Sequence, residues 1–332
     1  MTEPAVAICI VSTDEVQNLI GVLDSLSRST HAKFSVFICE NGGSAGFERS
    51  CRGLESADFL KVDGSSSGAR RDFTLRPAGQ RVSLLDPGSN QGYAGGTNAG
   101  IRAALEEGGY DAFWVLNPDT FPEPEALQAL IERQAEGPYG MVGSRIVFTA
   151  NGLIQMWGGF DWNHWLARGP RSFGYLQAKD APVDVADVER RMEVVCGASM
   201  YVTRDYLDDV GLMDESLFVF CEDSDWCLRR GRHRLGYAHA SIVHHIHGAT
   251  SGSSTDKKRI SPFNLYLTAR NRVRLVRKQF GALWPAPALL IFADLLRFLI
   301  KGTPAGYLTA LKGWWAGVKG EGGPPPMLAR RS

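Results

Sequence analysis

The chain has 332 residues, of which 44% are hydrophobic and 22% are charged, so it can form a large core and is not a low-complexity protein. Its formal net charge is zero, but residues 267–332 hold eleven Lys and Arg against two acids and carry +9, which leaves −9 for the rest. This distribution argues against nucleic-acid binding along the whole chain. It favours contact between the C-terminal segment and an anionic surface.

The cysteines and the N-terminus indicate a cytoplasmic protein. The six cysteines have no CxxC spacing, which argues against a zinc ribbon and against a disulfide framework. The opening MTEPAVAICIVST lacks the basic segment and the long apolar run of a signal peptide. We therefore expect the chain to work in a reducing cytoplasm.

The first half of the chain alternates strand-like and helix-like segments. Apolar runs predict strands at 5–11, 34–39, 82–85 and 112–116, and helical spacing of apolar residues predicts helices at 14–28 and 101–107. Polar turns or glycine-rich stretches follow several of the strands, at 40–44, 90–100 and 117–119. This repetition predicts an α/β fold with a doubly wound, mostly parallel sheet flanked by helices.

The second half is less regular. Residues 141–195 are rich in Gly, Trp and Arg, and we expect loops and a small mixed sheet over the active site. The segment 282–300 is the most hydrophobic. The uncharged run 280–293, which covers most of it, has only 14 residues, short of the roughly 20 that span a bilayer.

Charged residues in this C-terminal region predict helices that lie at an interface. Asp294, Arg297 and Lys301 share one helical face, and 307–318 combines two tryptophans with Lys312. Basic, tryptophan-bearing amphipathic helices bind anionic lipid headgroups. The alternative is that these helices pack on the catalytic domain or form a homo-oligomer interface.

An Asn117-Pro118-Asp119 sequence directly follows the strand at 112–116. A carboxylate at a strand end can hold Mg²⁺ or Mn²⁺, and such a cation stabilises a departing diphosphate. Taken alone, these three residues more often form a plain turn.

Three carboxylates lie within four residues at Glu222-Asp223-Ser224-Asp225. Such clustering is costly unless the acids bind a cation or share protons, and one of them can act as a general base. Acids also favour helix N-termini, and both functions are compatible if Asp225 pairs with Arg229 one turn later.

Two further segments indicate ligand contacts. Histidines at 244, 245 and 247 follow a short apolar strand, which suggests a metal or phosphate contact, although a polar loop is an alternative for two of them. The stretch 90–98 places glycines before a helix, where backbone N–H groups can approach a diphosphate. It is not the GxGxxG pattern, which argues against a nicotinamide dehydrogenase.

Taken in order, these segments resemble family 2 glycosyltransferases with a GT-A fold, most closely a rhamnosyltransferase-like branch. The matching segments run from residue 5 to about 275. They are 8–12, 39–42, 90–100, 116–119, 197–200, 211–215, 222–229, 245–251 and 270–272.

The resemblance implies roles for individual residues. Asp223 would be the catalytic base, supported by Glu222 and Asp225. The donor would be bound by Ser12, Glu40, Asn41, Asn90, Gly92, Gly95, Gly96, Asn98 and Asn117. The acceptor pocket would be shaped by Gly197, Ala198, Asp214 and Glu215. Asp119 and His245 would bind a divalent metal, Mg²⁺ or Mn²⁺, with His247 as a rival to His245.

Two residues depart from the family pattern. Asn117 stands where the fuller metal motif has Asp, which leaves fewer carboxylates for the metal. Glu40, the residue that would contact the nucleobase, stands where Asp is commoner.

The resemblance also implies a domain organisation and a reaction. Residues 1–265 would form the catalytic domain, with a donor half of about 1–120 and an acceptor half of about 121–265, and 266–332 a basic helical tail. The enzyme would invert the anomeric centre while transferring a sugar, rhamnose as the leading candidate, from a dTDP- or UDP-linked donor. A lipid-linked or polysaccharide acceptor at the inner face of the cell membrane, in cell-envelope glycan synthesis, would receive it. The alternatives are a galactofuranosyl or other hexosyl donor, or an inactive protein that only binds sugar nucleotides.

Overall fold

The computed structural model describes residues 3–169, 172–246, 260–300 and 303–328. The strands of this part are β1 (Val6–Ser12), β2 (Phe34–Glu40), β3 (Leu60–Ser67), β4 (Arg70–Leu75), β5 (Arg81–Leu85), β6 (Ala112–Leu116), β7 (Thr120–Pro122), β8 (Tyr139–Phe148), β9 (Ile154–Trp157), β10 (Gly159–Phe160), β11 (Val194–Val195), β12 (Ser199–Thr203) and β13 (Arg234–His245). The helices are α1 (Val16–Ser27), α2 (Gly43–Glu55), α3 (Gly92–Glu107), α4 (Ala126–Ala135), α5 (Val185–Arg191), α6 (Arg204–Val210), α7 (Glu222–Leu228), α8 (Pro262–Phe280), α9 (Pro285–Leu295), α10 (Arg297–Ile300) and α11 (Pro304–Lys319).

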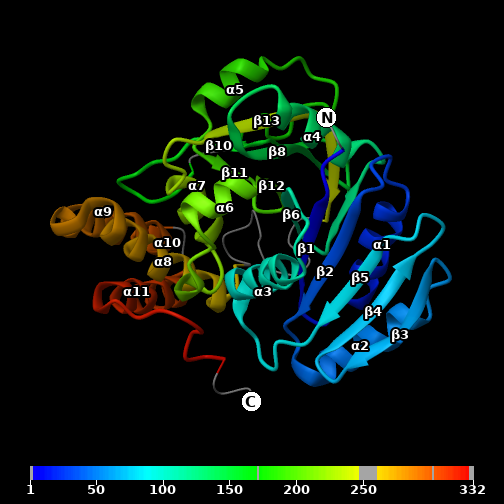
Figure 1. Cartoon of the computed structure of the whole chain (residues 1–332). Coiled ribbons are helices and arrows are strands. Elements are labelled where there is room, and N and C mark those ends of the chain that lie inside the picture. Colours follow the sequence, from blue (N-terminus) through cyan, green and yellow to red (C-terminus); the bar gives the residue numbers. More distant parts are fainter. Residues whose placement is uncertain (1–2, 170–171, 247–259, 301–302, 329–332) are drawn as a thin grey trace.

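A large twisted sheet runs through the molecule, with helices on both faces (Figure 1). In the described residues its order is β3-β4-β5-β2-β1-β6-β12-β8-β13-β7, with β9 paired to β8. The neighbours β5, β2, β1 and β6 are parallel, whereas β12 joins β6 and β8 in antiparallel register. The predicted α/β fold with a sheet flanked by helices is therefore confirmed.

The alternating side chains of β1 explain the three layers. All seven residues of β1 are buried, as expected for a strand covered on both faces. Val6, Ile8 and Ile10 pack in the core with side chains of α1, α2 and α4. Ala7 and Cys9 pack on the opposite face with α3.

The structure also corrects several predicted elements. Residues 43–55, of which only 43 and 44 were assigned, to a turn, form α2, and the hairpin β3–β4 precedes the strand predicted at 82–85. α3 begins at Gly92 rather than at residue 101, and the segment predicted as irregular contains β8 in the main sheet. The glycines of α3 obscured its first turns: a Cβ on Gly96 would lie 2.7 Å from a methyl of Val11, so the helix needs glycine to approach β1.

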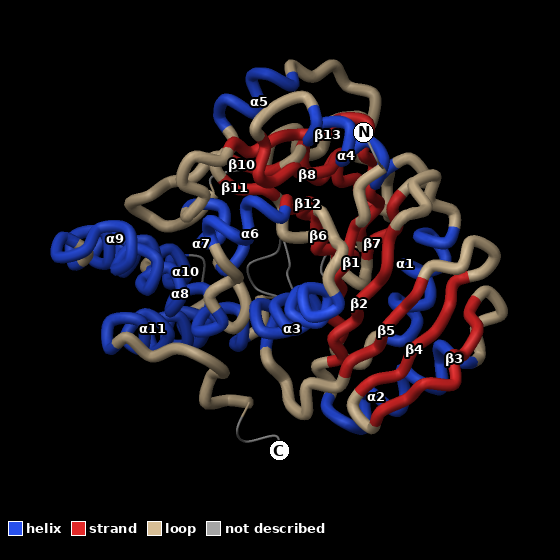
Figure 2. Tube along the Cα trace, in the orientation of Figure 1, coloured by secondary structure: helices blue, strands red, loops and turns tan. Residues whose placement is uncertain are grey.

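The C-terminal helices form a layer at the side of the molecule away from β3 (Figure 2). α8 begins with a Ser261 cap, whose Oγ accepts from the Asn264 N–H at 3.2 Å, followed by proline at the first helical position. Val273 and Val276 of α8 belong to the same core cluster as α3. The predicted division at residues 265 and 266 falls inside this helix.

The charged face of the segment 282–300 is oriented differently from the prediction. Its helix is broken into α9 and α10. Asp294 forms ion pairs with Arg168, Arg272 and Arg297. The charged side chains therefore face the protein, and the exposed side is apolar. Lys301 lies outside the described residues. Within the ranges described, no helix combines the length and the apolar character needed to cross a membrane.

Candidate active site

A cavity of about 620 Å³ lies at the carboxyl ends of β1, β2 and β6. Doubly wound folds bind ligands at this edge, where strand ends and helix N-termini meet. The predicted site residues in its wall are Asn41, Asn90, Gly92, Asn117, Asp119, Gly197, Ala198, Glu222, Asp223 and His245. The cavity thus brings together segments that are far apart in the sequence.

A strained turn delivers the two central carboxylates to this cavity. Phe218, Phe220 and Cys221 have φ of 68°, 69° and 69°, in the left-handed region that costs a residue with a Cβ about 1–2 kcal/mol. We call residues 218–221 the left-handed turn. It ends where α7 begins, so that Glu222 and Asp223 occupy the first helical positions, as the sequence suggested.

Asp223 is half-buried in the cavity wall, and both Ser224 and the backbone of Gly197 hydrogen-bond to its carboxylate. Its Oδ1 accepts hydrogen bonds from the N–H of Ser224 at 2.6 Å and from the Ser224 hydroxyl at 3.1 Å. A Cβ on Gly197 would lie 2.9 Å from Oδ2, so glycine is needed there for the approach. Burial raises the pKa of Asp223, and hydrogen bonds from Ser224 and from the Gly197 backbone offset only part of that shift.

Glu222 is more deeply buried, with 5% of its surface exposed. Burial and then the nearby Asp223 charge raise the pKa of Glu222 well above its ordinary value. Its Oε2 has no hydrogen-bond partner among the described residues. Glu222 and Asp223 therefore form a pair of wall carboxyls that favour protons more than ordinary acids do.

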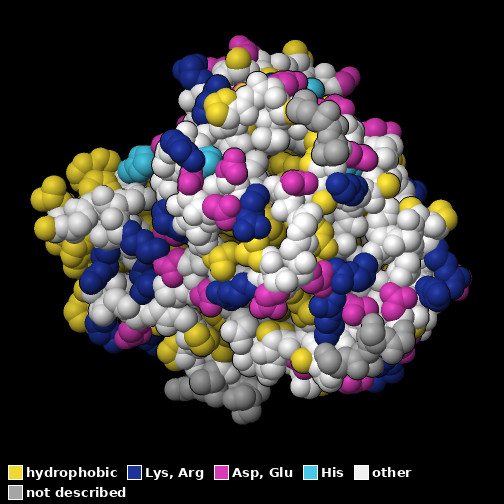
Figure 3. All heavy atoms as spheres, viewed as in Figure 1, with side chains coloured by type: hydrophobic (Ala, Val, Ile, Leu, Met, Phe, Trp, Pro, Cys, Tyr) yellow, Lys and Arg dark blue, Asp and Glu magenta, His cyan; other side chains and the backbone are white. Residues whose placement is uncertain are grey.

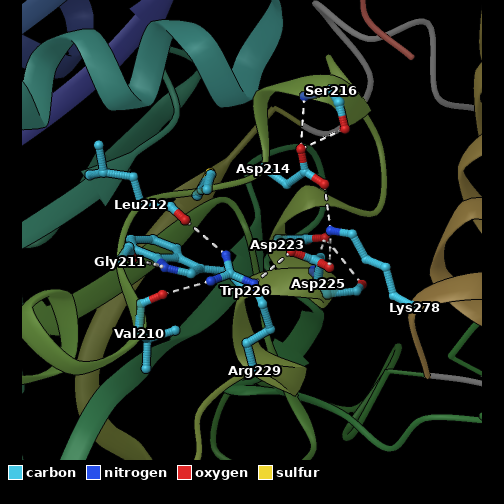
Figure 4. Close-up of polar contacts among 12 residues, drawn as sticks. Val210, Gly211, Leu212, Asp214, Ser216, Asp223, Asp225, Trp226, Arg229 and Lys278 are labelled. Carbon is cyan, nitrogen blue, oxygen red and sulfur yellow. Dashed lines mark hydrogen bonds and ion pairs between the residues drawn. The ribbon is translucent and has the colours of Figure 1, made fainter. Parts of the chain in front are cut away.

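Asp225 and Asp214 are paired with cations instead (Figure 4). Asp225 accepts from Arg229 Nε and from Lys278 Nζ, both at 2.8 Å, which confirms the predicted pairing one turn apart. Lys278 also pairs with Asp214. Although burial opposes it, the hydrogen bonds from Lys278 and Ser216 lower the pKa of Asp214 to about 2. Neither acid is part of the cavity wall.

The side chains of Asp119 and His245 lie next to each other in the cavity wall. His245 Nδ1 lies 2.8 Å from Gln155 Oε1, an acceptor, so this nitrogen carries a proton. His245 Nε2 lies 3.3 Å from Asp119 Oδ1. In the neutral ring this contact sets a lone pair against a carboxylate, an arrangement suited to a shared divalent cation.

The Asp119–His245 pair therefore fits a metal with few protein ligands. No group of three or more His, Cys, Asp or Glu side chains in the described ranges is placed to hold a metal. Asn117 Oδ1 nearby is buried without a hydrogen-bond partner in the described part. Phosphate oxygens and water would have to complete the coordination, as Mg²⁺ and Mn²⁺ sites allow. His247 lies outside the described residues.

Several predicted donor-binding residues form a scaffold behind the wall. Glu40 is fully buried, and its carboxylate accepts from Ser12 Oγ, Ser50 Oγ and the N–H groups of Asp14 and Gly42, all within 2.8–2.9 Å. This carboxylate fixes the loop after β2 and has no oxygen directed to the cavity. Ser12 is one of its donors and likewise lies outside the wall.

The α3 residues of that prediction divide in the same way. Asn98 donates to Met213 O at 2.9 Å and to Glu215 Oε1 at 2.8 Å, and thereby ties α3 to the segment before the left-handed turn. Gly95 and Gly96 serve close packing and are not in the wall. Glu215, predicted to shape the acceptor pocket, is instead part of this tie. In the wall itself, Asn41 donates to Gly92 O at 2.8 Å.

Sequence reasoning missed three contributors to the wall. Tyr93 donates its hydroxyl to Gly197 O at 2.8 Å and lies beside Asp223. Gln155 orients His245 from β9, in a segment that was predicted to be irregular. Phe218, Val219 and Phe220 of the left-handed turn also line the cavity. Only Tyr93 had a signal, since it lies within the glycine-rich stretch.

Comparison with known proteins decides the class of this site. Residues 7–183, more than half of the chain, match the family model described as glycosyl transferase family 2. The chain belongs to glycosyl transferase family 2. It is therefore a glycosyltransferase, and the cavity is its candidate active site.

Individual relatives support the same class. This glycosyltransferase is 27% identical over 233 residues to the low-salt glycan biosynthesis hexosyltransferase Agl10 of Haloferax volcanii. The match covers 65% of the chain and 66% of Agl10, just under two thirds of that protein. The rhamnosyltransferase-like branch is not among these findings.

Solved structures support the GT-A fold. One similar structure is a mannosyltransferase of Pyrobaculum calidifontis, PcManGT, solved with GDP-Man and Mn²⁺. Its TM-score is 0.52 at 13% identity, and the match covers all of this chain and 79% of PcManGT. GalNAc-T7, solved with UDP, GalNAc and Mn²⁺, has a TM-score of 0.55 at 14% identity, covering 83% of this chain and 48% of its own. These similarities concern the fold.

Proposed function

We propose that this glycosyltransferase inverts the anomeric centre of a nucleoside-diphosphate sugar in one displacement, with Asp223 as general base. The observation that carries the proposal is the contrast at Asp223: Oδ1 is held by Ser224, while Oδ2 lies beside Gly197 in the cavity wall. Positioned general bases contribute about 10²–10⁴-fold to rate. This position of Oδ2 supports Asp223 as the carboxylate that receives the proton.

The proposed reaction balances at these groups. Asp223 Oδ2 accepts the proton of an acceptor hydroxyl, whose oxygen forms a bond to the anomeric carbon. The bond from that carbon to the diphosphate oxygen breaks, and the oxygen keeps the electron pair. Asp119 and His245 would hold the divalent cation, Mg²⁺ or Mn²⁺, which when bound neutralises charge on the departing diphosphate. Asn41, Asn90 and Gly92 would bind the donor from the opposite wall.

The donor is the open part of this proposal. Rhamnose from a dTDP-linked donor is the leading candidate from the resemblance, and Agl10 favours a hexose more generally. Galactofuranosyl transfer is the alternative within the family, and an inactive sugar-nucleotide-binding protein is the alternative outside catalysis. In either active case the cavity accepts a nucleoside diphosphate with its sugar.

The test is nucleotide release by purified protein with a panel of dTDP-, UDP- and GDP-sugars, with Mn²⁺, with Mg²⁺ and with EDTA. We expect one nucleotide sugar of the panel to release its nucleotide in a metal-dependent reaction, which identifies it as the donor. Nucleotide binding without turnover of any donor, even with polyprenyl-diphosphate glycans present, would contradict catalysis and favour the inactive alternative.

We also propose that the C-terminal helices dock on the anionic inner face of the cell membrane, where a lipid-linked glycan acceptor in cell-envelope synthesis would lie. Their exposed side is apolar: Ile300 is 86% exposed, Leu283 74% and Leu289 63%. Hydrophobic side chains gather at the end formed by α9 (Figure 3). The +9 charge of residues 267–332 favours an anionic bilayer over a second copy of the chain.

Point variants test this docking better than a deletion, because Ala288 and Ile291 of α9 belong to the core. Leu289→Glu and Ile300→Glu should each weaken binding to phosphatidylserine vesicles by about tenfold, since each removes one aliphatic side chain that would enter the bilayer. The matched control is Leu176→Glu, 50% exposed in another part of the molecule. Equal vesicle binding by all three would contradict membrane docking. A concentration-dependent dimer lost in the first two variants would assign the face to a second copy.

A further inference from the structure

The left-handed turn is held from behind by one side chain of α8. Asn271 is fully buried, and its Nδ2 lies within hydrogen-bond distance of the carbonyl oxygens of Leu217 at 2.8 Å, Val219 at 2.9 Å and Phe220 at 2.7 Å. Two N–H groups are thus shared among three carbonyls of one short segment. Backbone strain of this kind persists only where surrounding contacts hold it.

Neighbouring residues of α8 orient Asn271 and extend its effect. Arg270 Nε donates to Asn271 Oδ1 at 3.0 Å, which directs the amide nitrogen toward the turn, and Arg270 Nη2 donates to Leu217 O at 3.1 Å. About two helical turns further on, Lys278 reaches Asp225 of α7 and Asp214 (Figure 4). α8 therefore holds the segment on both sides of the turn, and Asn271 contacts the turn itself at Val219 and at the strained Phe220.

The turn joins the two sides of the cavity. Phe218 O accepts from the N–H of Ala94 in α3 at 3.2 Å, and a Cβ on Gly92 would lie 2.3 Å from the same oxygen. Phe220 and Cys221 lead directly into Glu222 and Asp223. A displacement of the turn would therefore move Asp223 relative to a donor bound along Asn90 and Gly92.

We propose that Asn271 is a positioning residue, which fixes the left-handed turn so that Asp223 Oδ2 is directed at the acceptor hydroxyl. The inference rests on the proposed base function of Asp223 and extends it to a residue outside the cavity. Asn271 contacts no substrate in this proposal. It acts only through the backbone of 217–220.

The test is the pH dependence of kcat for Asn271→Ala, with transfer measured at saturating donor. We expect kcat to fall by about 100-fold, the loss expected from misplacing a reacting group by about 1 Å, while KM for the donor changes less than about threefold. The acid limb of kcat should move to lower pH, because a displaced Asp223 is better solvated. A purely structural role would reduce the amount of active enzyme and leave the limb where it is.

Two further variants keep the test decisive. Arg277→Ala is the matched control on the same helix: its guanidinium donates to Val318 O at 2.6 Å and does not contact the turn. It should keep kcat and the acid limb of the wild type. Asn271→Ser keeps one donor, and it carries the test if Asn271→Ala does not fold, with an expected loss of about tenfold.

An unmoved acid limb in the folded Asn271 variants, or equal losses in Arg277→Ala, would overturn the positioning role. Failure of the proposed function has a different signature, because the wild-type enzyme itself would then transfer no sugar.

Discussion

The two walls of the cavity use their polar residues in different ways. On the side of β2 and α3, Glu40 and Asn98 form hydrogen bonds with protein groups, and they support the wall from behind. On the opposite side, Glu222 and Asp223 lie in the wall itself, while the lysine and arginine of this region pair with Asp214 and Asp225. Carboxylates satisfied by the protein build the scaffold, and those left to the cavity are available for chemistry.

Replacement of Asp223 should give the largest effect on this comparison. We expect Asp223→Asn to lower kcat by about 10³-fold, because the amide cannot accept the acceptor proton, within the range for general bases. Nucleotide affinity, measured by calorimetry, should stay within about threefold of the wild type. Asp208→Asn, an exposed acid paired with Arg204, is the matched control and should be fully active. Loss of nucleotide binding in Asp223→Asn would assign Asp223 to the donor instead.

The second largest effect should come from Asp119, the proposed metal-binding carboxylate. Asp119→Asn should lower kcat by about 100-fold, a loss comparable to removing one group that stabilises developing charge. Gln155→Leu, which removes the hydrogen-bond acceptor of His245 Nδ1, should raise the Mn²⁺ concentration for half-maximal rate by about 10–100-fold. Rates that are unaffected by EDTA in the wild type would contradict the assignment of both residues to a metal.

Replacement of Glu40, which supports the wall from behind, should lower the stability of the fold rather than the rate of the reaction. Glu40→Gln should reduce the free energy of unfolding by about 2–4 kcal/mol, because an amide nitrogen would face donors that now point at a carboxylate oxygen. Urea unfolding measures this change, with Glu48→Gln, an exposed position on α2, as the control. A stable Glu40→Gln variant with lost donor affinity would place Glu40 at the nucleotide.

The smallest expected effect is a gain in stability when Glu222 is replaced. Its pKa is raised in the folded state, so the folded protein binds more protons than the unfolded chain, and stability falls as pH rises above the ordinary value of 4.5. Glu222→Gln removes this penalty and should raise Tm more at pH 8 than at pH 5. Thermal unfolding at both pH values checks the difference. A variant less stable than the wild type at pH 8 would mean that Glu222 has a stabilising partner.

The sequence predicts the fold well where burial is complete. The apolar run of β1 and the polar turns after β2 and β6 are enough to predict a parallel sheet with a site at the strand ends. α2 was missed because only Phe47, Cys51 and Leu54 mark its buried face among glycines and polar residues. The start of α3 was missed because its glycines are required by packing on β1.

The site was predicted in part for a related reason. Asp119, Asp223 and His245 lie in the cavity wall, as expected from acids and a histidine that follow strands or begin a helix. Residue type alone does not distinguish Glu40 from Asp223, because the difference lies in tertiary donors from Ser12 and Ser50. The contacts of Asn271 with the left-handed turn bridge about fifty residues of sequence, and no local pattern reports them.

The most direct test of Asp223 as the base is the single-turnover transfer rate on preloaded donor, measured against pH for the wild type and for Asp223→Asn. Because burial raises the pKa of Asp223, the wild-type rate should fall with decreasing pH at values above 3.8, the ordinary value for Asp. The residual rate of the variant should lack this limb. A variant that keeps both the wild-type rate and the same acid limb would contradict the account.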